Sequence, residues 1–430
     1  MTTLRPLAGA AILLATVFST GASQSTVLKA SRLIVGDGTV IENPVVIVVG
    51  DRIMAVGPAG KVAIPAGAKV IDLGQRTILP GLIDCHTHIT SIDNDGGDMS
   101  ILKETGAHAA IYGVINAKKT IDAGFTTIRD VGAQFGADFA LRDVINRGLI
   151  PGPRIYAAGP ALGILGGHAD VNGYSPLVTI PGTGAIVTGA DEARRQVRWD
   201  VKYGADLIKI VATGGILSVG DAASASQFSD EELRAAVEEA TRLGRKVAAH
   251  AHGAKGIIAA TNAGVASIEH GSLIDDAGIT AMKAHGTYLV PTLIILEEII
   301  RDGAKNGTPE YAIAKAKIVE PERRVRLKKA YLAGVKFAFG TDATGSIHGR
   351  NAQEFKLMVD QLGATPMAAI LTATSGAADL IGIGDQVGTI TVGKWADIIA
   401  VEGNPLDDVT KLEHVSFVMK GGAVMKGGAQ

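Results

Sequence analysis

Apolar and polar positions follow two different patterns along this chain, one at its ends and another in its middle. Towards the N-terminus, apolar runs such as Val45–Val49 are short and are separated by turns rich in glycine and aspartate. The C-terminal part repeats this pattern in Gly388–Val392, Ala396–Val401 and Val415–Lys420. Short apolar runs bounded by turn residues are typical of β-strands. We therefore predict that residues 24–77 and 385–430 together form one small β-sandwich domain.

Residues 78–384 alternate between strand-like apolar runs and longer helical stretches, the pattern of a parallel sheet with crossover helices. One predicted helix, Ser229–Leu243, begins with a capping box, because Glu232 follows Ser229 by three positions. Eight strand–helix units of this kind predict an α/β fold, a TIM-like (β/α)8 barrel. The predicted strands are Ile78–His88, Phe125–Val131, Arg154–Ala158, Asp206–Ala212, Lys246–His252, Ser267–His270, Thr287–Leu293 and Lys336–Asp342.

The first 23 residues have the three-part pattern of a secretory signal peptide. Arg5 precedes the apolar run Leu7–Phe18, and small residues follow at Gly21–Ser23. The alternative is a buried N-terminal helix, since the run is too short to span a bilayer. We predict a signal peptide over residues 1–23 and a periplasmic or secreted mature protein. The single cysteine, Cys85, cannot form a disulfide within the chain and is predicted to be a small buried apolar residue.

Charge excludes some classes of partner. The net charge is −2 and charged residues make up 20% of the 430 residues, with no long run of one sign. This balance argues against binding to nucleic acid or to a membrane surface through basic patches. We therefore expect a small-molecule substrate, and no membrane association once the signal peptide is removed.

Side chains that bind metals recur where the predicted barrel strands end. The first strand ends in His86-Thr87-His88, and alternate side chains of a strand point to the same side. His86 and His88 can therefore bind one metal ion together. The C-terminal ends of barrel strands converge at one mouth, and three later strands end near further candidate ligands. These ligands are His250, His270 and Asp342.

Lys209 lies inside the apolar run Leu207–Val211, in a strand that the barrel would bury on both faces. A buried ammonium group is unfavourable unless it is neutralised or paired. A neutral amine can react with carbon dioxide to form a carbamate, an anionic ligand able to bridge two metals. The alternatives are a lysine that extends to the barrel rim and a Schiff-base nucleophile. With histidines and an aspartate at the same mouth, we favour the carbamate.

These motifs resemble those of the amidohydrolase superfamily over nearly the whole mature length. Within the superfamily, the chain is similar to the branch that holds imidazolonepropionase-like proteins, Xaa-Pro dipeptidase-type carboxypeptidases and ochratoxin-hydrolysing amidases. The segments that carry the resemblance are Pro80–His88, Ile208–Ile210, Ala249–Gly253, Ile268–Gly271 and Gly340–Asp342.

The resemblance implies a binuclear metal site. His86, His88 and Asp342 would bind one metal, His250 and His270 would bind the other, and carboxylated Lys209 would bridge the two. Imidazole and carboxylate ligands suit Zn²⁺, so two zinc ions are expected, with another divalent first-row metal as the alternative. A water shared by two metals has a pKa near neutrality and supplies hydroxide. Asp342 is then the expected catalytic residue, which takes the proton of this water and passes it to the leaving amine.

Five further residues are predicted to bind the substrate. His168 lies in the glycine-rich segment 158–172 after the third strand and resembles a substrate-contacting position, with a solvated loop residue as the alternative. His252 faces the same way as His250 and either orients substrate or is a core histidine with its hydrogen bonds satisfied. His348 and Arg350 follow the last strand and could bind a substrate carboxylate, and Tyr174 is a weaker candidate. His108, His285 and His414 are predicted to be structural.

The resulting prediction is an exported binuclear hydrolase that cleaves amide bonds of N-acyl amino acids or removes C-terminal residues from small peptides. The resemblance implies that ochratoxin A, which would release phenylalanine, is among its substrates. It also suggests a homo-oligomer, with an octamer as one form. The alternatives are an Xaa-Pro dipeptidase, a hydrolase of cyclic amides or lactones, and, more remotely, a non-catalytic barrel scaffold.

Overall fold

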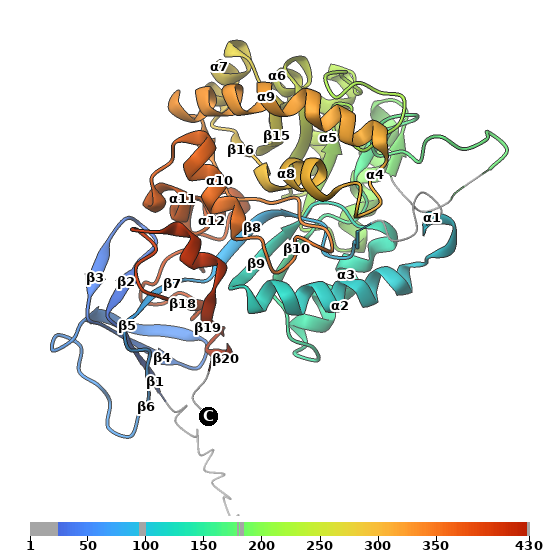
Figure 1. Cartoon of the computed structure of the whole chain (residues 1–430). Coiled ribbons are helices and arrows are strands. Elements are labelled where there is room, and N and C mark those ends of the chain that lie inside the picture. The colour runs from blue at the N-terminus through green and yellow to red at the C-terminus, as the bar shows by residue number, and fades with distance from the viewer. Residues whose placement is uncertain (1–24, 94–99, 179, 181–184, 428–430) are drawn as a thin grey trace, which may run out of the picture.

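A computed structural model of the chain describes residues 25–93, 100–178, 180 and 185–427, and the predicted signal peptide lies outside these ranges. Two parts are visible in Figure 1, a β-rich part built from both chain ends and a larger α/β part. The β-rich part contains a four-stranded sheet with the order β5-β4-β1-β6 and a six-stranded sheet with the order β20-β19-β18-β7-β2-β3. Its strands are β1 (Thr26–Lys29), β2 (Arg32–Ile34), β3 (Val40–Glu42), β4 (Pro44–Val49), β5 (Arg52–Pro58), β6 (Lys69–Asp72), β7 (Arg76–Pro80), β18 (Ile398–Glu402), β19 (Val415–Lys420) and β20 (Ala423–Lys426).

The two sheets of this part share one apolar core, as expected of a β-sandwich. Leu28 and Val46 from the first sheet pack in the same cluster as Ile78, Ile398 and Phe417 from the second. All five side chains are fully buried. Strands β7 and β18 pair antiparallel although more than 300 residues separate them, so the N- and C-terminal segments form a single unit.

The segment Ile78–His88, predicted to be one barrel strand, is two strands in two different sheets. Strand β7 ends at Pro80 and belongs to the sandwich, whereas β8 (Leu82–Thr87) is the first barrel strand. Gly81 lies between them, and a Cβ atom there would be 2.1 Å from Oγ1 of Thr126. Both strands are buried and apolar, so hydrophobicity alone does not indicate where one ends and the other begins.

The larger part is a barrel of eight parallel strands surrounded by helices, as predicted. Its strands are β8, β9 (Phe125–Asp130), β10 (Arg154–Ala157), β13 (Leu207–Val211), β14 (Lys246–Gly253), β15 (Ser267–Leu273), β16 (Tyr288–Val290) and β17 (Lys336–Phe337), and the short strands β11 (Leu162–Ile164) and β12 (Ala185–Val187) extend the sheet beside β13. The helices are α1 (Ser100–Lys103), α2 (Gly106–Asp122), α3 (Ala137–Asn146), α4 (Ala190–Tyr203), α5 (Asp230–Arg242), α6 (Ala254–Ala263), α7 (Asp276–His285), α8 (Leu293–Asp302), α9 (Glu310–Leu332), α10 (Gln353–Leu357), α11 (Pro366–Thr372) and α12 (Ser375–Ile381).

Backbone hydrogen bonds close the barrel between its first and last strands. The amide of Cys85 donates to the carbonyl of Phe339 at 2.9 Å, and the amide of His88 donates to the carbonyl of Ala343 at 2.9 Å. The amide of Asp342 in turn donates to the carbonyl of His86 at 2.8 Å. The last strand is shorter than predicted, because the backbone beyond Phe337 bends to make these bonds. Candidate ligands from opposite ends of the barrel sequence are therefore neighbours.

Helices α8 and α9 pack against each other, and Figure 1 shows α9 crossing the barrel part from one side to the other.

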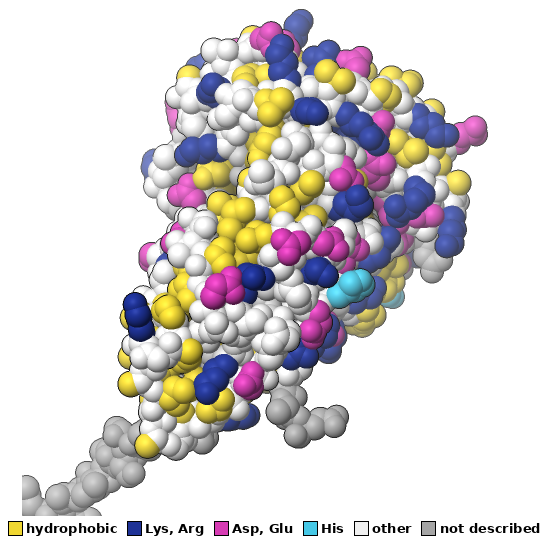
Figure 2. Space-filling view, turned by 60° about the vertical axis from the view of Figure 1, so that its left-hand side comes forward, with side chains coloured by type: hydrophobic (Ala, Val, Ile, Leu, Met, Phe, Trp, Pro, Cys, Tyr) yellow, Lys and Arg dark blue, Asp and Glu magenta, His cyan; other side chains and the backbone are white. Residues whose placement is uncertain are grey.

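On the face drawn in Figure 2, hydrophobic side chains gather in an irregular band, and basic and acidic side chains are intermixed around it. No extended patch of one charge sign covers that face, which agrees with the near-neutral net charge. Among the described residues, no helix combines the length and the apolar character needed to cross a membrane.

Candidate metal centre

The first candidate ligand cluster joins the first barrel strand to the segment after the last one. Nε2 of His86 lies 3.3 Å from Oδ1 of Asp342, and Nε2 of His88 lies 3.2 Å from the same oxygen. His86 lies on β8 and His88 directly follows its last residue, and their alternate positions direct the rings to one side. Two imidazole nitrogens and a carboxylate oxygen thus converge on one point, as the sequence predicts.

A second cluster consists of His250 and His252 on β14 and His270 on β15. One ring nitrogen from each of these residues lies within 4.8 Å of the others. The rings of His86 and His270 have centroids 5.0 Å apart, so the two clusters are adjacent. His252 contributes a third ring nitrogen next to those of the predicted ligands His250 and His270.

Lys209 on β13 lines the same pocket as both clusters and is 3% exposed. Burial lowers the pKa of its ammonium group from 10.5 to about 8. The neutral amine, which is the form that reacts with carbon dioxide, is therefore more populated near neutral pH than in an exposed lysine. The position fits the predicted bridging carbamate.

Hydrogen bonds to the second ring nitrogen orient the histidines. Nδ1 of His86 faces Oε2 of Glu269 at 2.8 Å, and Nδ1 of His88 donates to the carbonyl of Gly132 at 2.8 Å. Partners of this kind fix the tautomer and leave the other nitrogen for a metal. The remaining contacts are His250 Nε2 with the carbonyl of Gly214 (3.2 Å), His252 Nδ1 with Ser272 Oγ (2.8 Å) and His270 Nδ1 with Thr292 Oγ1 (2.7 Å).

Glu269, which was not assigned a role from the sequence, supports the centre together with Arg129, which the sequence had offered as a weaker candidate for a substrate contact. Glu269 is fully buried on β15 and pairs with Arg129, whose Nη2 lies 2.8 Å from Oε1. Burial would raise the pKa of Glu269, but Arg129 and His86 hold it at about 2. The Glu269 carboxylate is therefore ionised and accepts the Nδ1 proton of His86. A charged residue next to His270 within an apolar strand was the available signal for this role.

The electrostatics of the pocket suit a cation-binding centre. Burial lowers the pKa of His250 and His270 well below the usual histidine value, and lowers that of His252 to about 3. These rings are therefore neutral, the form that binds metals. Burial would raise the pKa of Asp342, but His86 and His88 hold it well below its ordinary range. Neutral imidazoles beside an ionised carboxylate fit a divalent metal ion.

Two of the candidate ligands have strained backbones. His270 has φ of 69° and Asp342 has φ of 57°, the left-handed region that residues other than glycine rarely adopt. Such strain is typical of functional sites, where the surrounding structure maintains it. The turn at Asp342 directs its carboxylate back towards His86 and His88, which a straight continuation of β17 would not do.

His168 is the predicted substrate-binding residue that the structure places most clearly in the pocket. Its ring lies 4.6 Å from that of His250, measured between centroids, and Nδ1 is buried with no hydrogen-bond partner among the described residues. Burial lowers its pKa to about 4, so the ring is neutral at physiological pH. The glycine-rich segment that carries it includes the short strand β11 and is not a simple loop.

His252 also lines this pocket, whereas the three remaining predicted substrate contacts do not. His348 is buried against α2, where its Nδ1 meets Thr120 Oγ1 at 2.9 Å. Arg350 pairs instead with Glu298, with 2.8 Å between Nη2 and Oε1. Tyr174 lies on the loop after β11 and does not line the pocket. Substrate binding by these three residues stays a prediction, because positions in a loop do not reveal from the sequence which way a side chain points.

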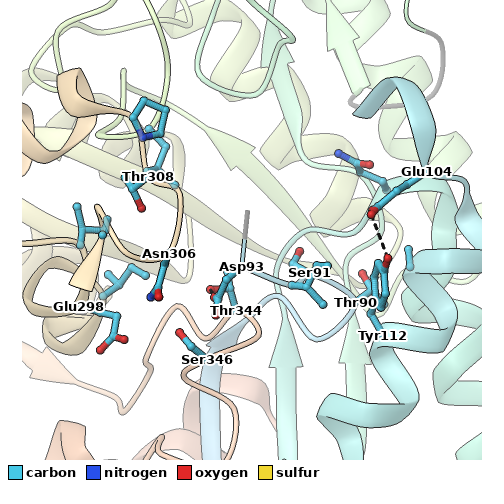
Figure 3. Close-up of a pocket in the computed structure, with 18 of the residues that line it drawn as sticks. Thr90, Ser91, Asp93, Glu104, Tyr112, Glu298, Asn306, Thr308, Thr344 and Ser346 are labelled. Atoms are coloured by element: carbon cyan, nitrogen blue, oxygen red, sulfur yellow. Dashed lines mark hydrogen bonds between the residues drawn. The ribbon is translucent and has the colours of Figure 1, made fainter. Parts of the chain in front are cut away.

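The pocket that contains both ligand clusters has a volume of about 310 Å³, and a second chamber of about 350 Å³ lies next to it. The two cavities share Ser91, Gln134 and Thr344, and Ile295 and Ile299 of α8 form part of the wall between them. Figure 3 shows this outer chamber, in which hydroxyl and carboxylate groups line the wall together with apolar side chains such as Ile92 and Leu217. Its acidic side chains are Asp93, Glu104 and Glu298, and no lysine or arginine among the described residues lines it.

Comparisons with known proteins identify relatives over almost the whole chain. Residues 77–425 match the amidohydrolase family. The ochratoxinase of Aspergillus niger is 34% identical, over 96% of this chain and 88% of the relative. A solved Xaa-Pro dipeptidase with methionine bound in its active site superposes with a TM-score of 0.88 at 39% identity, covering 94% of this chain and all of that structure. A prolidase complexed with N-methylphosphonate-L-proline gives a TM-score of 0.87 at 33% identity, covering 94% and 100%.

Proposed function

The chain belongs to the amidohydrolase family and is a hydrolase of amide bonds, and we propose that its two ligand clusters form one binuclear metal centre. The observation that carries this proposal is the convergence of free ligand atoms from four barrel strand ends. His86, His88 and Asp342 would hold one metal, and His250 and His270 the other. Lys209, as a carbamate, would bridge them.

Zinc is the metal that we propose, because neutral imidazoles and carboxylates are its usual oxygen and nitrogen ligands. When bound, the two ions supply hydroxide at neutral pH and polarise the scissile carbonyl. The Asp342 carboxylate is ionised and partly exposed to the pocket, with 20% of its side-chain surface accessible. It is therefore placed to accept the proton of the attacking water and to transfer it to the leaving amine.

The neutral His168 ring lines the same pocket as the ligand clusters, next to the ring of His250, and we propose that it binds the substrate. A neutral imidazole has one N–H donor, and Nδ1 of His168 has no partner among the described residues. We propose that this ring donates a hydrogen bond to a substrate oxygen. Ile216, Leu296 and Ile299 line the same pocket with apolar surface, which excludes water from around the reacting groups.

The substrate class that we propose is an amide between an acyl group and the amino group of a free amino acid. N-acyl amino acids and the C-terminal bond of small peptides both belong to this class. Ochratoxin A, whose cleavage releases phenylalanine, is proposed as one member, on the basis of the similarity to ochratoxinase.

A second candidate, an Xaa-Pro dipeptidase, is favoured by the outer chamber and by two structural relatives. Glu298 is neutralised by Arg350 and Arg301, but Asp93 and Glu104 have no cationic partner in the described part of the chain. Their negative charge would favour a substrate that carries an ammonium group on its acyl side. A dipeptide with a free N-terminus has such a group, whereas an N-acyl amino acid does not.

One panel of substrates tests both candidates. The purified protein, with its metal content measured, is assayed on N-acetyl-phenylalanine, ochratoxin A and several Xaa-Pro and Xaa-Phe dipeptides. Hydrolysis of the acylated phenylalanines supports the first candidate, and a strong preference for free Xaa-Pro dipeptides supports the second. A fully metal-loaded protein that leaves every amide intact would refute both.

We also propose that the protein is exported and forms a homo-oligomer. The leader pattern in residues 1–23 supports the first statement, and the resemblance to the amidohydrolase branch supports the second. N-terminal sequencing of protein from a cell fraction and light scattering of the purified protein test them. An intact leader on cytoplasmic protein, or a monomer at micromolar concentration, would contradict the respective proposal.

A further inference from the structure

His168 lies in the segment after β11, whereas the other pocket histidines lie on a barrel strand or directly after one. Its position depends on the loop between β13 and α5. A Cβ atom on Gly215 of that loop would lie 2.2 Å from Nε2 of His168, so the ring rests directly on the glycine backbone. The other side of the ring faces His250. The orientation of His168 is therefore set by whatever holds this loop in place.

A chain of hydrogen bonds connects His168 to helix α9. The backbone amide of His168 donates to Oε1 of Gln227 at 3.0 Å. Nε2 of Gln227 donates to Oδ2 of Asp221 at 3.0 Å. The other Asp221 oxygen, Oδ1, accepts from Nζ of Lys315 at 3.1 Å. The first step joins the segment of His168 to the loop between β13 and α5, the second lies within that loop, and the last one leaves it for α9.

Lys315 also holds the loop under the His168 ring. Its Nζ donates to the carbonyl of Gly215 at 3.1 Å and to that of Ser218 at 2.8 Å. An ammonium group has three N–H donors, and these two carbonyls together with Asp221 use all three. One cation thus fixes both the glycine beneath the ring and the carboxylate that positions Gln227.

Among the pocket side chains, this connection reaches His168 and, through the carbonyl of Gly214 next to Gly215, the ring of His250. The predicted metal ligands are carried by barrel strands or their ends and have orienting partners of their own, such as Glu269 for His86 and Thr292 for His270. Lys315 and Asp221 are 23% and 12% exposed, so their ion pair is largely shielded from solvent and weakly screened.

We propose that Lys315, acting through Asp221 and Gln227, is a positioning residue that sets the orientation of His168 over the catalytic pocket. The expected loss of activity rests on the proposed amide hydrolysis, whereas the expected movement of the His168 ring does not. Loss of Lys315 releases the loop and moves the His168 ring, while the metal-binding groups stay in place.

The kinetic experiment compares Lys315→Met, Lys315→Arg and the control Lys317→Met in the metal-loaded enzyme. Lys317 is exposed on the same helix, two positions away. Lys315→Met should lower kcat/KM about tenfold or more, the usual effect of removing an outer hydrogen-bonding partner of a site residue, with metal content unchanged. Lys315→Arg should restore part of the loss, and Lys317→Met should have no effect.

A double-mutant cycle with His168→Asn separates positioning from general destabilisation. In that background Lys315→Met should reduce kcat/KM less than twofold further, because the residue it positions is already gone. An equal loss in both backgrounds, or a loss that parallels metal content, would overturn the inference. If Lys315→Met does not fold, Gln227→Ala takes its place in the same cycle.

Histidine side-chain NMR gives a readout that needs no substrate. The ring signals of His168, assigned from their absence in His168→Asn, should shift in Lys315→Met and stay unchanged in Lys317→Met. Unchanged signals in Lys315→Met refute the positioning role. A shift without any amide hydrolysis by the wild-type protein would instead refute the proposed function and leave the positioning intact.

Discussion

In the proposed mechanism, the Asp342 carboxylate has two roles, because it would bind the first metal and would also carry the proton. Asp342→Asn keeps the size of the side chain and one ligand oxygen but removes the proton acceptor. We expect kcat to fall at least about 100-fold, within the range for loss of a general acid–base group, while much of the metal is retained. Parallel kinetics and metal analysis measure this, and a variant with near-normal kcat would exclude Asp342 as the proton carrier.

Lys209 provides a second prediction at the level of one side chain. Lys209→Arg keeps a positive charge but cannot form a carbamate, and Lys209→Ala removes the group altogether. Both variants should bind less metal and lose activity by about 100-fold or more, as expected when a group that stabilises transition-state charge is lost. With ¹³C-labelled bicarbonate, the wild-type protein should show a carbamate signal that both variants lack. A fully active Lys209→Arg variant would rule out the bridging carbamate.

Sequence reasoning succeeded for residues whose direction follows from a strand and was weaker elsewhere. Alternation along β8 was enough to place His86 and His88 on one side. Loop positions carry no such rule, so His168 lines the pocket whereas His348 packs against Thr120. The pairing of Glu269 with Arg129 joins two strands far apart in sequence, and no local pattern reports such a contact.

At the level of elements, helix α4 contains a buried acid with a raised pKa. Asp200 is fully buried near the C-terminal end of the helix, and one of its carboxylate oxygens has no partner among the described residues. Burial raises its pKa from 3.8 to about 8. The unfolded chain therefore loses this proton at a lower pH than the folded protein, and stability falls as the pH rises between these two values.

Asp200→Asn resembles the protonated acid at every pH and should remove this dependence. Near pH 4 the two proteins should be similarly stable, and at pH 8 the variant should be more stable by about 1–3 kcal/mol, the usual penalty of an unsatisfied buried polar group. Thermal unfolding across this pH range measures the difference. Asp191→Asn, at an exposed position in the first turn of the same helix, is the control. A constant difference between Asp200→Asn and wild type at all pH values would contradict the assignment.

Elements were predicted well where the hydrophobic period was unambiguous. Strands β9, β13 and β14 lie within a residue or two of their predicted limits. The division between β7 and β8 was missed because both are buried apolar segments, and the pairing of β7 with β18 is a tertiary contact. The short β17 was overestimated because the following residues bond to β8 through a bent backbone.

At the scale of the whole molecule, the first candidate ligand cluster lies across the seam where the barrel closes. His86 and His88 come from the first strand, and Asp342 follows the last one, so a metal bound between them links the two ends of the barrel sequence. In the described barrel, the bonds between β8 and the segment after β17 are isolated backbone contacts and a single bridge rather than a long ladder. Metal binding should therefore contribute to the stability of the entire barrel as well as to catalysis.

Chelation of the metal should accordingly lower the melting temperature. A ligand present at about 1,000 times its Kd stabilises the folded state by about 4 kcal/mol, which corresponds to a loss of several degrees when it is removed. Differential scanning calorimetry of the loaded, chelated and zinc-reconstituted protein measures this, with metal content determined for each sample. His88→Ala should shrink the difference between loaded and chelated protein, because one ligand of the seam is missing. His285→Ala, on α7 and outside the pocket, should preserve it. Equal melting temperatures for samples with and without metal would show that the seam is held by the backbone contacts alone.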